Sequence, residues 1–231
     1  MHTASAPATW RDRLATLLRD NRLVIVAELV IIVLVRFEIL LPFASSTIPL
    51  LLLGSLSLWL RQSGWREIGM GRPASWRRTI WMGTGIAVVG SILDWTVIIP
   101  LLRRLPGRPL DLSEFASLPG NLPLLLFWVA LSWTLAAFGE EMVHRGYILN
   151  RLSDLFGHSR AGWALSLCAM GLVFGVGHIY LGMAGLILNI VDGIVLGVLY
   201  LASGRNLWLP VIEHGVGNTL SFILLYLGFS L

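Results

Sequence analysis

The sequence predicts an all-α fold, a polytopic bundle of about seven or eight transmembrane helices. Hydrophobic residues make up 56% of the 231 residues, and charged residues only 13%. Several apolar runs approach or exceed the roughly 20 residues that cross a bilayer as a helix. These runs are too long for the strands of a membrane β-barrel and lack their polar and apolar alternation.

Each predicted span is an apolar run that ends near charged or turn-forming residues. The connections 61–78 and 103–120 contain proline and other turn residues. The second run is short, so a re-entrant segment is the alternative to a full span there. In the fourth run no helix breaker lies between Leu124 and Phe156, and Gly157 follows as a stop, so one long helix is expected. The predicted spans are 23–43, 44–60, 79–102, 121–155, 161–180, 183–202 and 207–230.

Residues 1–22 form a polar segment ahead of the first span. Charged residues precede any hydrophobic core in it and no small-residue cleavage pattern follows, which argues against a cleavable signal peptide. Apolar side chains recur at helical spacing, so the segment either lies along the membrane surface or is a solvated tail; they are Trp10, Leu14, Leu17 and Leu18. Residues 23–231 are predicted to form a single transmembrane domain.

The distribution of arginine predicts a cytoplasmic N-terminus. All 17 cationic residues are arginine; twelve fall in the predicted inside segments and three, Arg103, Arg104 and Arg108, in the predicted outside loop. The basic composition therefore points to anionic lipid headgroups, and we expect no nucleic-acid partner. The single cysteine, Cys168, allows no internal disulfide. A lysine-free chain of this kind is typical of a bacterial inner membrane protein.

A charged stretch directly follows the apolar residues 122–138. Glu141 and Arg145 are four residues apart in the favourable order, so they can pair along one face of the helix. Glu140 is left without a local partner. A carboxylate at membrane depth costs several kcal/mol unless it is partnered, protonated or placed at a water-filled cavity, so Glu140 is a candidate functional residue.

Two later helices offer polar groups in apolar surroundings. The sequence "FGVGH" contains Phe174 and His178, and "HGVGN" contains His214 and Asn218. His214 and Asn218 are four residues apart, which places them on one helical face.

The helical rise allows these groups to meet at one depth. If Arg151 and Arg205 mark the cytoplasmic surface, Glu140 lies about 16 Å and His214 about 13 Å above it, and His178 reaches about 22 Å. The sequence therefore predicts that three helices deliver four side chains to a common intramembrane pocket, namely Glu140, His178, His214 and Asn218.

Together these motifs resemble the CAAX prenyl endopeptidase and bacteriocin-processing family of intramembrane proteases. "EEMVHR" has the form E-E-x-x-x-R, followed in order by F-x-x-x-H and H-x-x-x-N. A further family pattern, F-x-x-G-x-x-x-G-x-x-Y, is matched except that isoleucine replaces phenylalanine, at Ile190, Gly193, Gly197 and Tyr200. The resemblance covers about residues 61–228.

The resemblance implies an endopeptidase that hydrolyses a peptide bond near or within the membrane. Its chemistry needs a water nucleophile, a base and donors for the developing oxyanion. We expect Glu140 to be the base and His178 its partner, with His214 and Asn218 as the oxyanion donors. Supporting side chains are expected at Glu141, Arg145 and Phe174.

Metal dependence and substrate are separate questions. Glu140, His178 and His214 could bind a catalytic zinc with an open water position, but H-E-x-x-H is absent. We favour a metal-free mechanism without a cofactor.

Asn189 and Asp192 either line a substrate cavity or belong to a buried hydrogen-bond network. The expected partners are the lipid bilayer and a membrane peptide or membrane protein, with a prenylated or otherwise hydrophobic C-terminal segment as one form of substrate.

Two other functions remain open. One is a scaffold or immunity protein of the same fold that binds a hydrophobic peptide without cutting it. The other is a secondary transporter that uses Glu140 as a proton relay, although no inverted repeat is visible.

Overall fold

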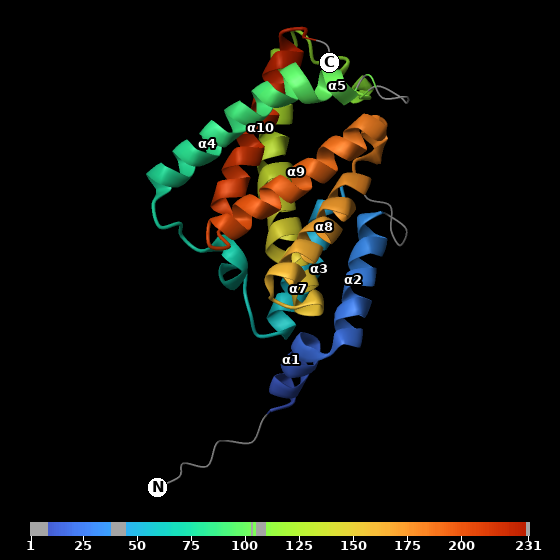
Figure 1. Cartoon of the computed structure of the whole chain (residues 1–231), viewed down its shortest axis with the longest axis vertical. Helices are drawn as coiled ribbons and strands as arrows, with labels where there is room; N and C mark the ends of the chain where they lie inside the picture. The colour runs from blue at the N-terminus through green and yellow to red at the C-terminus, as the bar shows by residue number, and fades with distance from the viewer. Residues whose placement is uncertain (1–8, 38–44, 103, 105–109, 230–231) are drawn as a thin grey trace.

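The computed structural model describes residues 9–37, 45–102, 104 and 110–229 (Figure 1). Most of these residues are helical, and no strand occurs among them. The α-helices are α1 (Trp10–Asp20), α2 (Arg22–Arg36), α3 (Thr47–Leu60), α4 (Trp76–Leu93), α5 (Ile99–Leu102), α6 (Leu122–Leu131), α7 (Leu149–Phe156), α8 (Arg160–Val176), α9 (Gly182–Ala202) and α10 (Trp208–Tyr226). The helical segments of other types are η1 (Arg66–Met70), η2 (Asp94–Ile98), η3 (Ser113–Phe115), η4 (Ser132–Glu140), η5 (Met142–Ile148) and η6 (Ile179–Leu181).

The helical class is confirmed, and each predicted span overlaps a helix. Within the described part of the chain, three continuous helices are long and apolar enough to cross a membrane, namely Trp76–Leu102, Leu122–Phe156 and Ile179–Ala202. α3 and α8 are apolar but shorter, so the predicted number of spans stays a prediction. The end of the predicted first span, and Arg103 and Arg108 of the orientation argument, lie outside the described residues.

The long helix Leu122–Phe156 is continuous, but it is not a uniform α-helix. η4 and η5 are π-helical segments on either side of Glu141. Gly157 ends the helix with φ 92°, a conformation that glycine adopts without strain. A wider helical turn is a feature that hydrophobic periodicity does not reveal, and such turns are frequent at functional sites.

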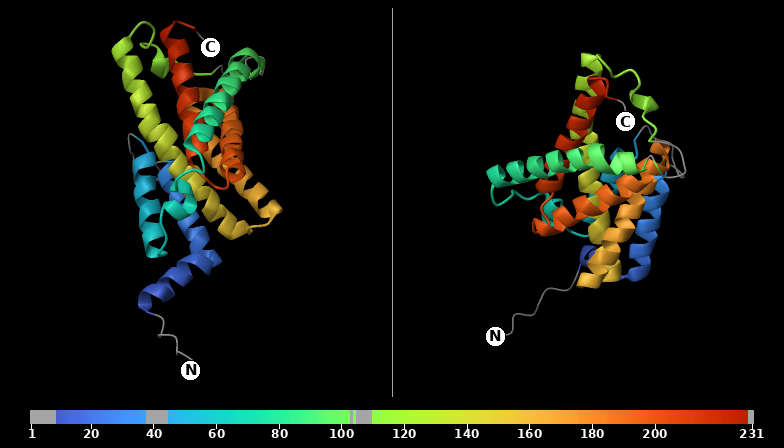
Figure 2. Two further views of the ribbon diagram at one scale, coloured as in Figure 1. Left: turned by 90° about the vertical axis from the view of Figure 1, so that its left-hand side faces the viewer. Right: turned by 45° about the horizontal axis from the view of Figure 1, so that its top comes forward.

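Two pairs of helices make the closest packing in the bundle. α4 packs along α10, and α8 packs along α9 (Figures 1 and 2). A β-carbon on Gly193 would come within 3.0 Å of the Cα atom of Gly171. The glycines of α8 and α9 therefore let the two backbones approach closely, as small residues do in membrane bundles.

The N-terminal segment is helical from Trp10. The Thr9 hydroxyl and the Asp12 carboxylate form a reciprocal capping box at the start of α1. α1 lies at the end of the molecule opposite the C-terminal end of α10 (Figure 1). Its predicted place on the membrane surface stays a prediction.

Arg151 is buried among other side chains, and its predicted depth at the cytoplasmic surface stays a prediction. Its side chain has no exposure, and its Nε donates to Glu28 Oε2 at 2.5 Å. It also donates to Asp154 Oδ2 at 3.1 Å and to the carbonyl of Leu18. The Tyr147 hydroxyl donates to the other oxygen of Glu28. Arg151 therefore joins α1, α2 and α7, and its charge is neutralised by Glu28, which is distant in sequence, and by the nearby Asp154.

We predict that Arg151→Met destabilises the protein by about 3–5 kcal/mol, because it leaves Glu28 as a buried charge without its cation. Equilibrium unfolding in detergent micelles measures the loss. Arg160→Met is the matched control, since Arg160 is exposed, and it should change the free energy of unfolding by less than about 0.5 kcal/mol. Equal losses for the two variants would contradict a structural role of the Glu28–Arg151 pair.

Candidate active site

The side chain of Glu141 is the centre of a buried polar cluster. Its Oε1 accepts from Arg145 Nη1 at 2.6 Å and from His214 Nδ1 at 2.8 Å. The side chains of Glu141 and Arg145 have no exposure, and that of His214 is 11% exposed. The helix-spacing prediction of a Glu141–Arg145 pair is confirmed. The hydrogen bond from His214 was not predicted from the sequence, and it connects the first motif to α10.

Arg145 extends this cluster to α8 and α9. Its Nη2 donates to the carbonyl of Gly193 at 3.3 Å. Its guanidinium lies 4.4 Å from the centroid of the Phe174 ring, within the range of a cation–π interaction. The three motifs therefore meet around one arginine.

The Phe174 ring is the apolar neighbour of three histidines. Its centroid lies 5.0 Å from that of His144, 4.7 Å from that of His178 and 6.5 Å from that of His214. Phe174 is itself 2% exposed. One ring thus fixes the spacing between the histidines of separate segments.

His178 lies just beyond the end of α8, whereas the sequence predicted it within a span. α8 ends at Val176, and His178 leads into the short helix η6. Its Nδ1 lies 2.9 Å from the Phe174 carbonyl oxygen, which can only accept, so Nδ1 carries a proton. In the neutral ring Nε2 is therefore the acceptor.

His144 makes the same kind of hydrogen bond as His178, and the sequence analysis assigned it no role. Its Nδ1 donates to the Glu140 carbonyl oxygen at 2.9 Å, and its buried Nε2 has no hydrogen-bond partner. Spacing alone could have indicated this bond, since the two residues are four apart.

The Glu140 carboxylate has different surroundings from the Glu141 carboxylate. Glu140 is partly buried, and it makes no side-chain hydrogen bond or ion pair with the described part of the chain. It interacts electrostatically with both His178 and His214. Glu140 therefore offers a free carboxylate beside two imidazoles.

Asn218 stands one helical turn after His214 on α10. Its Nδ2 donates to the Ser132 hydroxyl at 3.0 Å, so one of its two N–H groups is occupied and the other is free. Next to this bond, Trp133 Nε1 donates to the Thr219 hydroxyl at 3.0 Å. Sequence reasoning missed Ser132 because the alignment of η4 with α10 is a tertiary feature.

Asn189 and Asp192 have different surroundings. The Asn189 amide donates to the Gly185 carbonyl oxygen at 2.8 Å, one turn earlier in its own helix. The Asp192 carboxylate makes no hydrogen bond among the described residues and interacts electrostatically with Asp94, Glu213 and His214. Their assignment to a substrate cavity stays a prediction.

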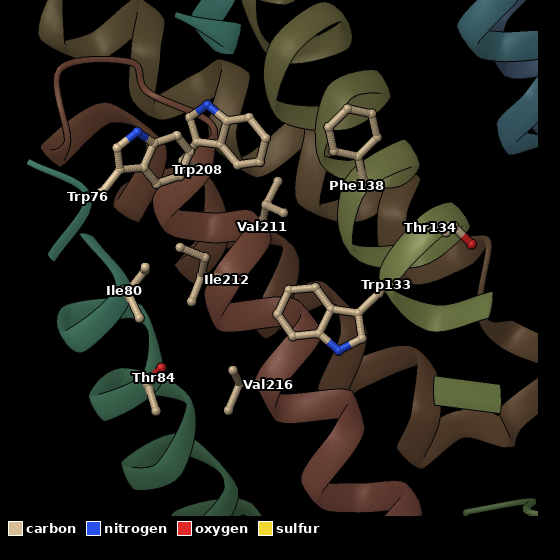
Figure 3. A pocket seen from close by; sticks show the side chains of 10 residues that line it. All are labelled: Trp76, Ile80, Thr84, Trp133, Thr134, Phe138, Trp208, Val211, Ile212 and Val216. Atoms are coloured by element: carbon tan, nitrogen blue, oxygen red, sulfur yellow. The ribbon is translucent and has the colours of Figure 1, made fainter. Parts of the chain in front are cut away.

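An apolar cavity of about 570 Å³ lies on the other side of α10, between α4 and η4 (Figure 3). Its lining is mostly aromatic and aliphatic: Trp76, Ile80, Thr84, Trp133, Thr134, Phe138, Trp208, Val211, Ile212 and Val216. The cavity lining includes Trp133, whose Nε1 donates to Thr219 on α10, but none of the side chains of the polar cluster.

The described residues include no group of three or more histidine, cysteine, aspartate or glutamate side chains arranged to hold a metal ion. Glu140, His178 and His214 lie near one another but do not form such a ligand set. The metal-free chemistry predicted from the sequence stays a prediction.

Fold and site together define an all-helical membrane protein with a buried cluster of acid, imidazole and amide groups between its helices. The model of the family described as type II CAAX prenyl endopeptidase Rce1-like matches residues 122–220, which confirms the resemblance predicted from the motifs. This segment contains all three motifs but not residues 61–121 of the predicted core. No curated protein matches the chain, and no solved structure does.

We predict that the neutral rings of His144 and His178 carry their proton on Nδ1, because each Nδ1 faces a carbonyl oxygen. Nitrogen chemical shifts of protein labelled at histidine distinguish the two tautomers, and His→Gln variants assign the signals. The exposed His158 is the control and should show a mixture of both tautomers. A proton on Nε2 of neutral His178 would contradict the arrangement.

Proposed function

We propose that the protein is an intramembrane endopeptidase that hydrolyses a peptide bond near or within the membrane. The family match over residues 122–220 carries this proposal, because that segment contains Glu140, His178, His214 and Asn218. The packing of His178 and His214 around Phe174, and the bond of His214 to Glu141, support it.

Glu140 is the proposed general base. A carboxylate without a hydrogen-bond partner can accept a proton from water, and His178 offers an acceptor nitrogen nearby. The water is then held by two acceptors, with one hydrogen directed to each, and its lone pair is free to attack the scissile carbonyl. His178 orients the water, and Glu140 takes its proton and then gives it to the leaving amine as the C–N bond breaks.

His214 and Asn218 are the proposed donors to the oxyanion. His214 Nδ1 donates to Glu141, so its Nε2 can donate only when the ring is an imidazolium. The adjacent carboxylate stabilises that cation, while Asn218 contributes its remaining N–H. Glu141, Arg145 and Phe174 are positioning residues, because they act through the side chains that they hold.

The proposed substrate is a membrane peptide or membrane protein with a hydrophobic segment, of which a C-terminal segment, prenylated or not, is one form. The apolar cavity between α4 and η4 supports a hydrophobic substrate, since it could bury an apolar segment (Figure 3). We place the protein in a bacterial inner membrane with a cytoplasmic N-terminus, in contact with lipid and not with nucleic acid.

A non-catalytic scaffold or immunity protein of the same fold is the alternative. Such a protein would bind a hydrophobic peptide at the same surfaces without needing Glu140 or His178. The two functions differ in whether purified wild-type protein cleaves a peptide that it binds.

We predict that Glu140→Gln lowers kcat at least about 100-fold while peptide affinity changes little, because the amide keeps the shape but cannot take the proton. Cleavage of a hydrophobic peptide by protein in liposomes measures kcat, and a binding titration measures affinity. Glu67→Gln, an exposed site in η1, is the control and should leave both unchanged. Wild-type protein that binds without cleaving would favour the scaffold.

We predict that cleavage does not require a metal ion. Elemental analysis of active, purified protein should find zinc far below one ion per chain, and dialysis against a chelator should leave kcat unchanged. A known zinc protease treated in parallel is the control. Stoichiometric zinc whose removal abolishes cleavage would overturn the metal-free mechanism.

A further inference from the structure

Trp133 connects the apolar cavity to the part of α10 that carries Asn218. It belongs to η4, it lines the cavity, and its indole points towards α10 (Figure 3). Its Nε1 donates to the Thr219 hydroxyl at 3.0 Å. An apolar segment bound in the cavity would therefore touch a side chain that is bonded to the residue next to Asn218.

The indole of Trp133 also lies directly against the backbone of α10 at Gly215. A β-carbon built on Gly215 would be 2.7 Å from Cε3 and Cζ3 of the indole, so the ring occupies the space that glycine leaves open. The Thr219 hydroxyl donates to the Gly215 carbonyl oxygen at 2.7 Å. Since a hydroxyl has a single proton, this bond leaves the Thr219 oxygen as the acceptor for the indole N–H. Trp133 thus contacts both ends of one turn of α10.

Two adjacent residues of η4 bond to two adjacent residues of α10. The Ser132 hydroxyl accepts from Asn218 Nδ2 at 3.0 Å, and Ser132 is buried. The next residue, Trp133, bonds to Thr219. We call residues 214–219 the donor turn, because it contains His214 and Asn218, the two proposed donors to the oxyanion. Its position relative to the long helix is therefore set in part by η4.

The position of the donor turn matters for the proposed chemistry. Donors stabilise an oxyanion only if they already point to the place where its charge develops, and a displacement of about 1 Å can lower a rate about 100-fold. Binding energy from a part of the substrate that does not react can hold catalytic groups in place, and it then raises kcat as well as affinity. A side chain that touches both the cavity and the donor turn can transmit this effect.

We propose that Trp133 is a positioning residue that makes the rate of hydrolysis depend on an occupied apolar cavity. An apolar segment of the substrate packs against the indole, and the indole holds the donor turn so that Asn218 points at the developing oxyanion. This proposal rests on the proposed function. Trp133 acts through Thr219 and does not touch the reacting atoms. The protein therefore hydrolyses peptides with an apolar segment faster, in addition to binding them more tightly.

The test compares Thr219→Val with Thr219→Ser in lipid nanodiscs. Valine keeps the shape of the side chain but cannot accept from the indole, whereas serine keeps the hydroxyl. Each protein is assayed with two peptides that share the residues around the cleaved bond, one with an apolar segment beside them and one without it. Wild type and Thr219→Ser should give about tenfold higher kcat for the peptide with the segment. Thr219→Val should lose this difference in kcat and keep the difference in KM.

Two further substitutions separate positioning from an effect on folding. Trp133→Phe keeps an aromatic ring against Gly215 but removes the N–H group, so it should reproduce Thr219→Val. The double variant should behave like either single variant, because both remove the same hydrogen bond. Trp81→Phe is the matched control, since Trp81 lies on α4, is 71% exposed and is not part of the cavity lining. It should leave kcat unchanged for both peptides.

A binding measurement separates this proposal from the proposed function. The probe is the peptide with the apolar segment, made resistant to cleavage by methylation of its scissile nitrogen. Its binding should shift the indole N–H signal of Trp133 in protein labelled with ¹⁵N at tryptophan, while the Trp81 signal stays in place. Loss of the signal in Trp133→Phe provides the assignment.

Three outcomes would overturn the proposal. An equal fall in kcat for both peptides in Thr219→Val shows that the bond supports the fold and not the response to the segment. Equal kcat of wild type for the two peptides, or a difference that Thr219→Val keeps, shows that Trp133 does not couple the cavity to the donor turn. Binding of the probe without a shift of the Trp133 signal shows that the segment binds elsewhere. A shift of that signal by a peptide that wild type binds but never cleaves contradicts the endopeptidase and leaves the contact between the segment and Trp133 supported.

Discussion

The candidate site depends on the buried carboxylate of Glu141, whose one oxygen binds both Arg145 and His214. A carboxylate, a guanidinium or an imidazolium buried alone at this depth would raise the free energy of the folded state. Buried together, the three groups offset one another's charge. This interaction joins the long helix to α10, so the orientation of His214 is set by a residue that lies 73 positions earlier. Glu141 and His214 can therefore hold their positions only as a pair.

The close packing of α8 against α9 positions the other partners of Arg145. Because glycines let α8 and α9 approach, the carbonyl of Gly193 comes within reach of Arg145, and Phe174 lies beneath the guanidinium. Larger residues at Gly171 or Gly193 would separate the two helices and remove both partners from Arg145. The small-residue pattern is thus a condition for the polar cluster as well as for helix packing.

The sequence indicated the helical class, the long helix and the Glu141–Arg145 pair, because hydrophobic run length and four-residue spacing are local properties. It did not indicate the π-helical turns, the burial of Arg151 or the Ser132–Asn218 bond. Each of these depends on which helix faces which, and Arg151 shows the difference clearly. An arginine near the end of an apolar run suggests a water-facing position, yet Glu28 on a separate helix neutralises it within the protein.

Glu140 and Glu141 are adjacent in sequence but have opposite surroundings. Neighbouring residues on a helix point in directions roughly 100° apart, and Glu141 lies between two π-helical segments that alter this angle locally. Glu141 binds Arg145 and His214 through Oε1, while Glu140 makes no side-chain hydrogen bond among the described residues and interacts electrostatically with His178. Two like acids with such different environments suit different tasks, one holding the histidine and the other accepting a proton. A helix that carried only one of them could not both fix His214 and leave a carboxylate free for chemistry.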